Sequence, residues 1–190
     1  MKKNIILFST IFILLVSCKN ETDKNLNEIT VSVGPEPQSI DPTINSAIDA
    51  MIYTTHLFEN LTIKDENNNI IPGAADSWIS SNNNTIYIFN IRSNAKWTDG
   101  VPVTANDFVY AWKRIVDPKS GASYSIYLDV IKNAHDIITG NMDKDKLSVK
   151  ALNDKTLYVE LEYPAPYFPE LITHTSYTPL REDIVSKNED

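Results

Sequence analysis

The chain has 190 residues, of which 42% are hydrophobic and 22% are charged, a composition that argues against a disordered or multi-span membrane chain. Its net charge of −8 argues against a nucleic-acid partner, because phosphate binding needs a basic surface. The single cysteine, Cys18, excludes an intramolecular disulfide and a thiolate metal cluster, and the five glycines never approach the spacing of a phosphate-binding loop. We therefore expect no cofactor.

The N-terminus carries the pattern of an export signal. Residues 1–3 are a basic leader, and the apolar run 5–16 has the length of a secretory core but is too short to span a bilayer stably. The run ends in Leu-Val-Ser-Cys, which resembles the bacterial lipobox. Residues 1–17 are thus predicted to be a lipoprotein signal peptide, Cys18 the lipidated N-terminus, and residues 18–27 a polar tether. The alternative is an ordinary signal peptide with an accidental cysteine.

The chain that follows first predicts a strand and then a helix. Alternating apolar residues indicate a strand over 28–33, with Ile29, Val31 and Val33 on one face. A longer apolar period predicts a helix over 44–60, with Ser46 or Asp49 as its cap. The apolar face of this helix would contain Ile44, Ala47, Ile48, Met51, Ile52, Thr55 and Phe58.

Two further strands are predicted, over residues 85–92 and 156–161. Asn-rich segments at 65–69 and 80–84 have turn chemistry, and residues 85–92 after them read as a strand. Residues 156–161 alternate in the same way. The stretch 163–169 contains three prolines, so it cannot be regular.

Two helices are predicted in the second half of the chain. Thr104 and Asp107 have the spacing of a capping box, and the helix behind them should end before Asp117 because a proline follows that residue. Its buried face would be Phe108, Ala111, Trp112 and Ile115. The second helix is predicted over 123–139, with Gly140 at its C′ position.

Five motifs follow one another along the chain: Glu36–Pro42, Leu57–Leu61, Pro72–Trp78, Ile91–Gly100 and Pro102–Phe108. Their order and spacing resemble the oligopeptide-binding proteins of bacterial ABC importers, which are family 5 of the extracellular solute-binding proteins. The resemblance covers residues 31–181 and implies a mixed α/β chain, the N-terminal part of a two-lobed, type II periplasmic-binding fold without its second lobe. Residues 28–60 would be the first segment of lobe I and residues 61–185 a subdomain of that lobe.

The same resemblance implies a non-enzymatic, peptide-capturing lipoprotein of the cell envelope. It would deliver short peptides to the membrane permease from the periplasmic or extracellular face, held to the membrane by the Cys18 lipid. A binder that tolerates many sequences should pair with the peptide backbone. By family analogy the pairing segment is Ser46-Ala47-Ile48, and Tyr124 faces the ligand. One wall without a second lobe should bind peptides weakly.

Alternative interpretations remain for the function and for the conspicuous residues. The chain could be a non-transporting surface lipoprotein that acts as an interaction or adhesion module. A hydrolase using Asp99 and Asp107 is set aside, because Asp107 is more simply a cap and neither carboxylate has a recognisable nucleophile beside it. No metal is expected, since the three histidines lack ligand spacing. Core packing and ion pairs are the expected roles of Trp78, Trp97, Trp112, Arg92, Lys96, Asp99 and Asp107.

Overall fold

The computed structural model describes residues 30–187, and from Val33 onward they form one compact unit. The predicted signal peptide, the Cys18 lipidation site and the tether lie outside the described residues. Within residues 30–187, no helix is long and apolar enough to cross a membrane. The mixed α/β class predicted from the sequence is confirmed.

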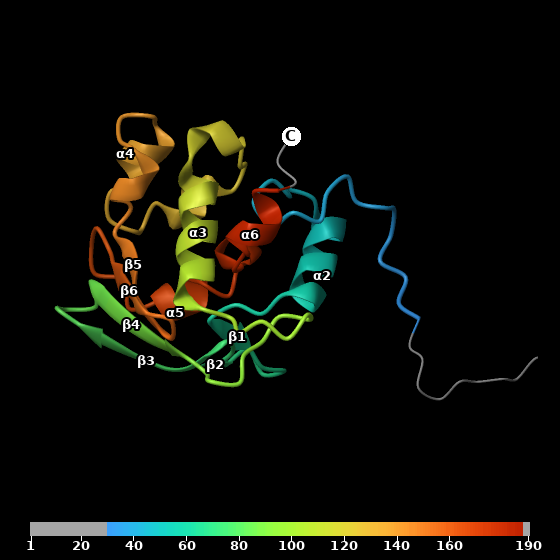
Figure 1. The fold of residues 1–190 in the computed structure, drawn as a ribbon, viewed down its shortest axis with the longest axis horizontal. Coiled ribbons are helices and arrows are strands. Elements are labelled where there is room, and N and C mark those ends of the chain that lie inside the picture. The colour runs from blue at the N-terminus through green and yellow to red at the C-terminus, as the bar shows by residue number, and fades with distance from the viewer. Residues whose placement is uncertain (1–29, 188–190) are drawn as a thin grey trace, which may run out of the picture. The chain divides into compact units, whose positions relative to one another are not determined.

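The compact unit contains a four-stranded antiparallel sheet that forms one side of it (Figure 1). Its strand order is β3-β4-β6-β5. The strands are β3 (Ala75–Ser81), β4 (Ile86–Ile91), β5 (Val149–Asn153) and β6 (Thr156–Glu160). The strands predicted over 85–92 and 156–161 are therefore confirmed, and their alternation places Tyr87, Phe89, Leu157 and Val159 in the core. A two-stranded sheet joins β1 (Thr62–Lys64) to β2 (Ile70–Pro72).

Helix α3 (Ala105–Val116) packs on this sheet through contacts with β5 and β6 (Figure 1). The capping box predicted at Thr104 is confirmed, and the Asp107 carboxylate accepts the Thr104 amide at 2.8 Å. The helix ends before Asp117, as the following proline requires. All four predicted core residues of α3 are fully or almost fully buried. Period, cap and stop signal therefore agree for this helix.

The helix predicted over 44–60 is shorter than expected. Helix α2 spans Ile48–Leu57, and Ala47, not Ser46 or Asp49, is at its N-cap, without a side-chain cap. Helix α2 begins later in the chain than predicted because local hydrogen bonds hold the preceding residues in a turn. The Asn45 side chain accepts the Ala47 amide at 2.9 Å, and the Asn45 amide donates to Asp41 O at 3.0 Å.

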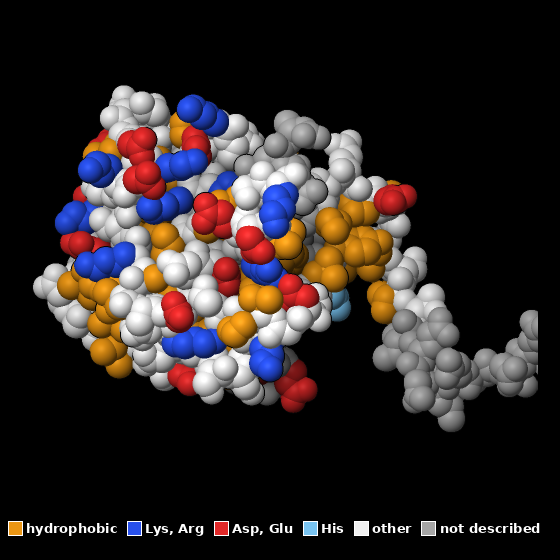
Figure 2. Space-filling view, in the orientation of Figure 1, with side chains coloured by type: hydrophobic (Ala, Val, Ile, Leu, Met, Phe, Trp, Pro, Cys, Tyr) orange, Lys and Arg blue, Asp and Glu red, His pale blue; other side chains and the backbone are white. Residues whose placement is uncertain are grey.

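The predicted apolar face of α2 is also wrong. The fully buried positions of α2 are Ala50 and Thr54, whereas Ile48 is 79% exposed. Figure 2 shows hydrophobic side chains gathered over this helix, where Ile44, Ile48 and Leu57 are exposed. The apolar residues do recur with a helical period, but part of the helix face that they form is not covered by other residues of the range 30–187.

The helix predicted over 123–139 is broken. A 3₁₀ turn covers Ser125–Leu128, and α4 is limited to Ala134–Ile138. Between them the chain turns, and an isolated bridge joins Ile131 to Leu161 just after the end of β6, with a bond from Lys132 N to Glu160 O at 3.0 Å. Asn133 then takes a left-handed conformation with φ 71°. Long-range strand pairing outweighed the local helical period. Gly140 does follow the helix, with φ 78°.

The remaining elements are short. No strand forms over residues 30–33 of the predicted strand, and Glu28 and Ile29 lie outside the described residues. The prediction that 163–169 is irregular holds up to Tyr167 but is wrong for Phe168 and Pro169, which begin a one-turn helix in which proline is tolerated in the first turn. The remaining helices are α5 (Phe168–Leu171) and α6 (Glu182–Val185). Three more 3₁₀ turns lie at Pro118–Ser120, Lys144–Lys146 and Thr175–Tyr177.

Candidate functional site

The segment predicted to pair with a ligand backbone lies on the surface at the entry to α2. Ser46, Ala47 and Ile48 are all exposed. Ala47 is extended, with φ −97° and ψ 142°, so the segment has strand-like geometry just before the helix begins.

The peptide groups of this segment divide into two sets. The Ala47 amide donates to Asn45 Oδ1 at 2.9 Å, and the Ala47 carbonyl accepts the Met51 amide at 3.0 Å. Within a trans peptide the N–H and C=O point in opposite directions, so the Ser46 carbonyl and the Ile48 amide point away from those internal partners. Among residues 30–187, the amides of Ser46 and Ile48 have no hydrogen-bond partner. These two amides therefore remain available as hydrogen-bond donors.

Tyr124 lies directly beside that edge. Its hydroxyl donates to Ser46 O at 3.1 Å, so residues far apart in the sequence meet, although the sequence linked them only through the family resemblance. The Tyr124 ring is edge-on to Tyr127 and to His174, with centroids 5.6 Å apart in both pairs.

Tyr127 and His174 belong to the same surface, and neither was predicted. Their rings stack with centroids 4.3 Å apart and an interplanar angle of 11°. The hydroxyl of buried Tyr177 donates to Tyr127 O, which ties the aromatic group to the core. The spacing of Tyr124 and Tyr127 could have indicated the pair, because residues i and i+3 share a face of a 3₁₀ helix. No local signal points to His174.

A cavity of about 480 Å³ opens beside this aromatic group. Helix α2, the 3₁₀ turn at 125–128 and helix α5 each contribute to its wall. Its lining combines aromatic, apolar and hydroxyl side chains with one ion pair, between Lys64 Nζ and Glu170 Oε1 at 2.8 Å. The lining residues are Met51, Thr55, Lys64, Tyr127, Tyr167, Glu170, Leu171, Thr173, His174 and Thr175.

Burial lowers the pKa of the His174 imidazole below its usual 6.5. The folded protein therefore binds this proton less readily than the unfolded chain, so stability should fall as the pH drops through 6.5 and level off below the folded-state pKa. Urea unfolding between about pH 8 and pH 5 should show this decrease, and His174→Gln should reduce it. Identical pH profiles for the two proteins would contradict the expectation.

The charged residues singled out in the sequence have structural partners. Arg92 pairs with Glu59 and donates to Gly73 O at 2.9 Å, and Asp99 pairs with Arg181. Asp107 is partly desolvated, which raises its pKa, and it accepts Thr104 N and Trp97 Nε1. Both carboxylates therefore have structural partners, as expected for them.

The remaining expectations concern core packing of the three tryptophans, the role of Lys96 and metal binding. Trp112 is fully buried, whereas Trp78 and Trp97 are partly buried and pack against the core, and Lys96 is exposed. Within residues 30–187, no cluster of His, Cys, Asp and Glu side chains could hold a metal ion.

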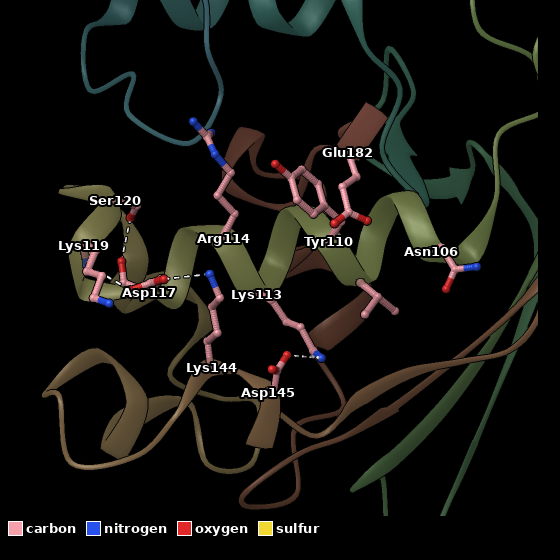
Figure 3. A pocket seen from close by; sticks show the side chains of 11 residues that line it. Asn106, Tyr110, Lys113, Arg114, Asp117, Lys119, Ser120, Lys144, Asp145 and Glu182 are labelled. Carbon is pink, nitrogen blue, oxygen red and sulfur yellow. Dashed lines mark hydrogen bonds and ion pairs between the residues drawn. The ribbon is translucent and has the colours of Figure 1, made fainter. Parts of the chain in front are cut away.

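A second hollow, of about 580 Å³, lies along the polar face of α3 (Figure 3). Lys113 reaches Asp145 at 2.8 Å, and Lys144 reaches Asp117 at 2.8 Å, as the dashed lines show. These two pairs connect α3 to the 3₁₀ turn at 144–146. Two of the lysines that line the hollow are thus paired with carboxylates that also line it.

The comparisons with known proteins agree with the fold. The sequence profile of the bacterial extracellular solute-binding proteins, family 5, matches residues 69–190. The chain is 41% identical over 156 residues to the periplasmic oligopeptide-binding protein OppA of Salmonella typhimurium, covering 81% of this chain and 28% of that protein. It is 39% identical over 157 residues to the periplasmic murein peptide-binding protein MppA of Escherichia coli, covering 82% and 29%.

A solved structure of a relative supports the same family membership. Haemophilus influenzae OppA in complex with RPPGFSPFR superimposes with a TM-score of 0.80 and 40% identity, covering 83% of this chain and 31% of that one. The chain thus spans about 30% of the length of such relatives, consistent with part of one lobe. By profile, sequence and structure, the chain belongs to family 5 of the bacterial extracellular solute-binding proteins.

Proposed function

We propose that this chain supplies one wall of the peptide site of a substrate-binding lipoprotein that serves an ABC importer. The observation that carries the proposal is the exposed edge of Ser46 and Ile48, whose amides have no partner within residues 30–187, beside Tyr124. Its relatives are named as oligopeptide-binding and murein peptide-binding proteins, which supports peptides as the ligand class. No catalytic role is assigned.

Backbone pairing at this edge would explain binding without regard to peptide sequence. The Ile48 amide would donate to a peptide carbonyl, and the second lone pair of the Ser46 carbonyl would accept a peptide amide. Every peptide offers these groups, so side chains would tune affinity without being required. The membrane permease would be the partner that receives the bound peptide.

The proposal is tested by amide NMR of the 190-residue chain titrated with millimolar trialanine. The amide signals of Ser46, Ile48 and Met51 should shift, with weak affinity because one wall immobilises the peptide with few contacts. Triproline is the matched control, since it lacks the internal amides and should shift these signals less. A chimera in which residues 30–187 replace the matching part of Salmonella OppA should bind more tightly. Absence of shifts near Ser46 in both proteins would refute the site.

The lipid anchor is a separate part of the proposal. Two acyl chains on Cys18 would hold the protein at a membrane surface of the cell envelope, because each buried CH₂ contributes about 0.8 kcal/mol and one chain alone is marginal. Mass spectrometry of the mature protein from a bacterial host should find a diacylglyceryl group on Cys18. Cys18→Ser should remain in the unprocessed, unlipidated form. Cleavage elsewhere, or an unmodified Cys18, contradicts the assignment.

A further inference from the structure

An apolar groove lies between the C-terminal end of α2 and helix α6, which are side by side in Figure 1. Its volume is about 720 Å³, and stretches of the chain near residues 40, 57, 97 and 180 contribute to its wall. We call it the α2–α6 groove. Its apolar lining includes Ile40, Pro42, Leu57, Phe58, Trp97 and Leu180.

The rim of this groove exposes large aliphatic side chains above a packed aromatic base. Ile40 is 50% exposed and Leu57 is 59% exposed, and hydrophobic side chains gather over α2 in Figure 2. The Phe58 and Trp97 rings are edge-on with centroids 6.3 Å apart, and both pack against the core. Removing such side chains from water is favourable, and clustered apolar side chains on a surface mark a contact site.

The charged residues of the groove already have partners within the structure. Arg114 Nη2 lies 2.9 Å from Asp41 Oδ2. Arg181 pairs with Asp99, and its Nη2 lies 2.6 Å from Asp183 Oδ2. A charged ligand would compete with these pairs, whereas an apolar surface would leave them intact. The groove therefore suits an apolar polypeptide surface better than a charged small molecule.

The lengths of the relatives indicate where such a surface comes from. The matched part is 28% of Salmonella OppA and 31% of the Haemophilus influenzae OppA chain, so more than two thirds of each relative lies outside it. Ile40 and Val185, which lie near the two ends of the described range, both line the groove. Further polypeptide joined at either end would start beside it. A second copy fits less well, because each chain has a net charge of −8 and two copies would repel.

We propose that the α2–α6 groove is an interface for further polypeptide of the family-5 kind, equivalent to the part of the relatives that lies outside the match. That polypeptide places its own apolar side chains against Ile40 and Leu57. The groove lining includes neither Ser46 nor Tyr124, so this interface is separate from the proposed peptide site.

The first test measures whether the groove is covered when that polypeptide is present. Leu57→Cys would be made in the 190-residue chain, together with Cys18→Ser, and in the Salmonella OppA chimera. The thiol at position 57 should react with a maleimide on the order of tenfold more slowly in the chimera, because access limits thiol reactivity. Mass spectrometry of the labelled peptides gives the rate at that position.

Ile79→Cys is the matched control for the labelling. Ile79 lies in β3, is 61% exposed and does not line the groove. Its thiol should react at similar rates in the two proteins. Equal rates at position 57 in the two proteins would overturn the proposal. No peptide is present in these measurements, so a failure of the proposed peptide site leaves the result unaffected.

The second test places a charge in the groove. Leu57→Asp should leave the thermal midpoint of the 190-residue chain nearly unchanged but lower that of the chimera, where the carboxylate would be buried. Ile79→Asp should affect both proteins equally. Equal effects of Leu57→Asp in the two proteins would contradict the interface. Should Leu57→Asp prevent the chimera from folding, the labelling rates decide, since Leu57→Cys introduces no charge.

Sedimentation of the chimera tests the other occupant. The chimera should sediment as a monomer with and without Leu57→Asp, because its own polypeptide covers the groove. A dimer of the chimera that Leu57→Asp dissociates would assign the groove to a second copy and overturn the proposal.

Discussion

Trp112→Ala is expected to lower the free energy of unfolding by about 3–5 kcal/mol, the range for a fully buried aromatic side chain. Trp112 is 0% exposed and is edge-on to Tyr177, with ring centroids 5.2 Å apart. Its Nε1 also donates to Tyr177 O at 2.9 Å. Truncation would leave a cavity and an unpaired carbonyl at once, so the loss should lie in the upper part of the range for core substitutions.

Urea unfolding followed by far-ultraviolet circular dichroism measures this effect without relying on tryptophan fluorescence. Trp78→Ala is the comparison, because Trp78 is only partly buried and should lose clearly less stability. The stability loss of Trp112→Phe should lie between the losses of Trp112→Ala and Trp78→Ala, because a ring remains while the bond to Tyr177 O is lost. A loss of less than about 1 kcal/mol for Trp112→Ala would show that α3 and its neighbours repack, contrary to the expectation.

Ile48→Pro should weaken peptide binding about tenfold, whereas Ile48→Ala should change it little. Proline removes the Ile48 amide, one of the groups proposed to pair with the peptide backbone. The fold should tolerate it, because Ile48 is the first residue of α2, where proline is favoured, and Ala47 already has the extended conformation that precedes a proline. The side chain is 79% exposed, so the alanine variant loses little packing.

Calorimetry of the chimera, with NMR of the 190-residue chain, would measure both variants against tri- to pentapeptides. Circular dichroism and thermal unfolding would show that each variant keeps the fold. Equal effects of the two substitutions in folded proteins would mean that Ser46 to Ile48 do not pair with the peptide.

The sequence by itself determined the elements whose signals are local. Helix α3 has its period, its capping box and its stop signal within a few residues of one another, and β4 and β6 alternate with period two. These signals act through hydrogen bonds and side-chain directions inside one turn or one strand. The family followed from five motifs in register, which needed no structure to be read.

The tertiary structure decided what depends on distant segments. Residues 123–139 have a helical period, yet Ile131 forms an isolated bridge with Leu161, just after the end of β6, which only the folded chain brings beside it. The backbone-pairing segment was predicted through the resemblance, but the bond from Tyr124 to Ser46 O and the packing of Tyr124 against His174 join segments that are far apart in the sequence. The sequence placed Asn60 at the end of the helix predicted over 44–60 and in one of the five motifs. Only the bond from its side chain to His174 O turned its oxygen into a buried acceptor, because local sequence does not determine which distant carbonyl a side chain will meet.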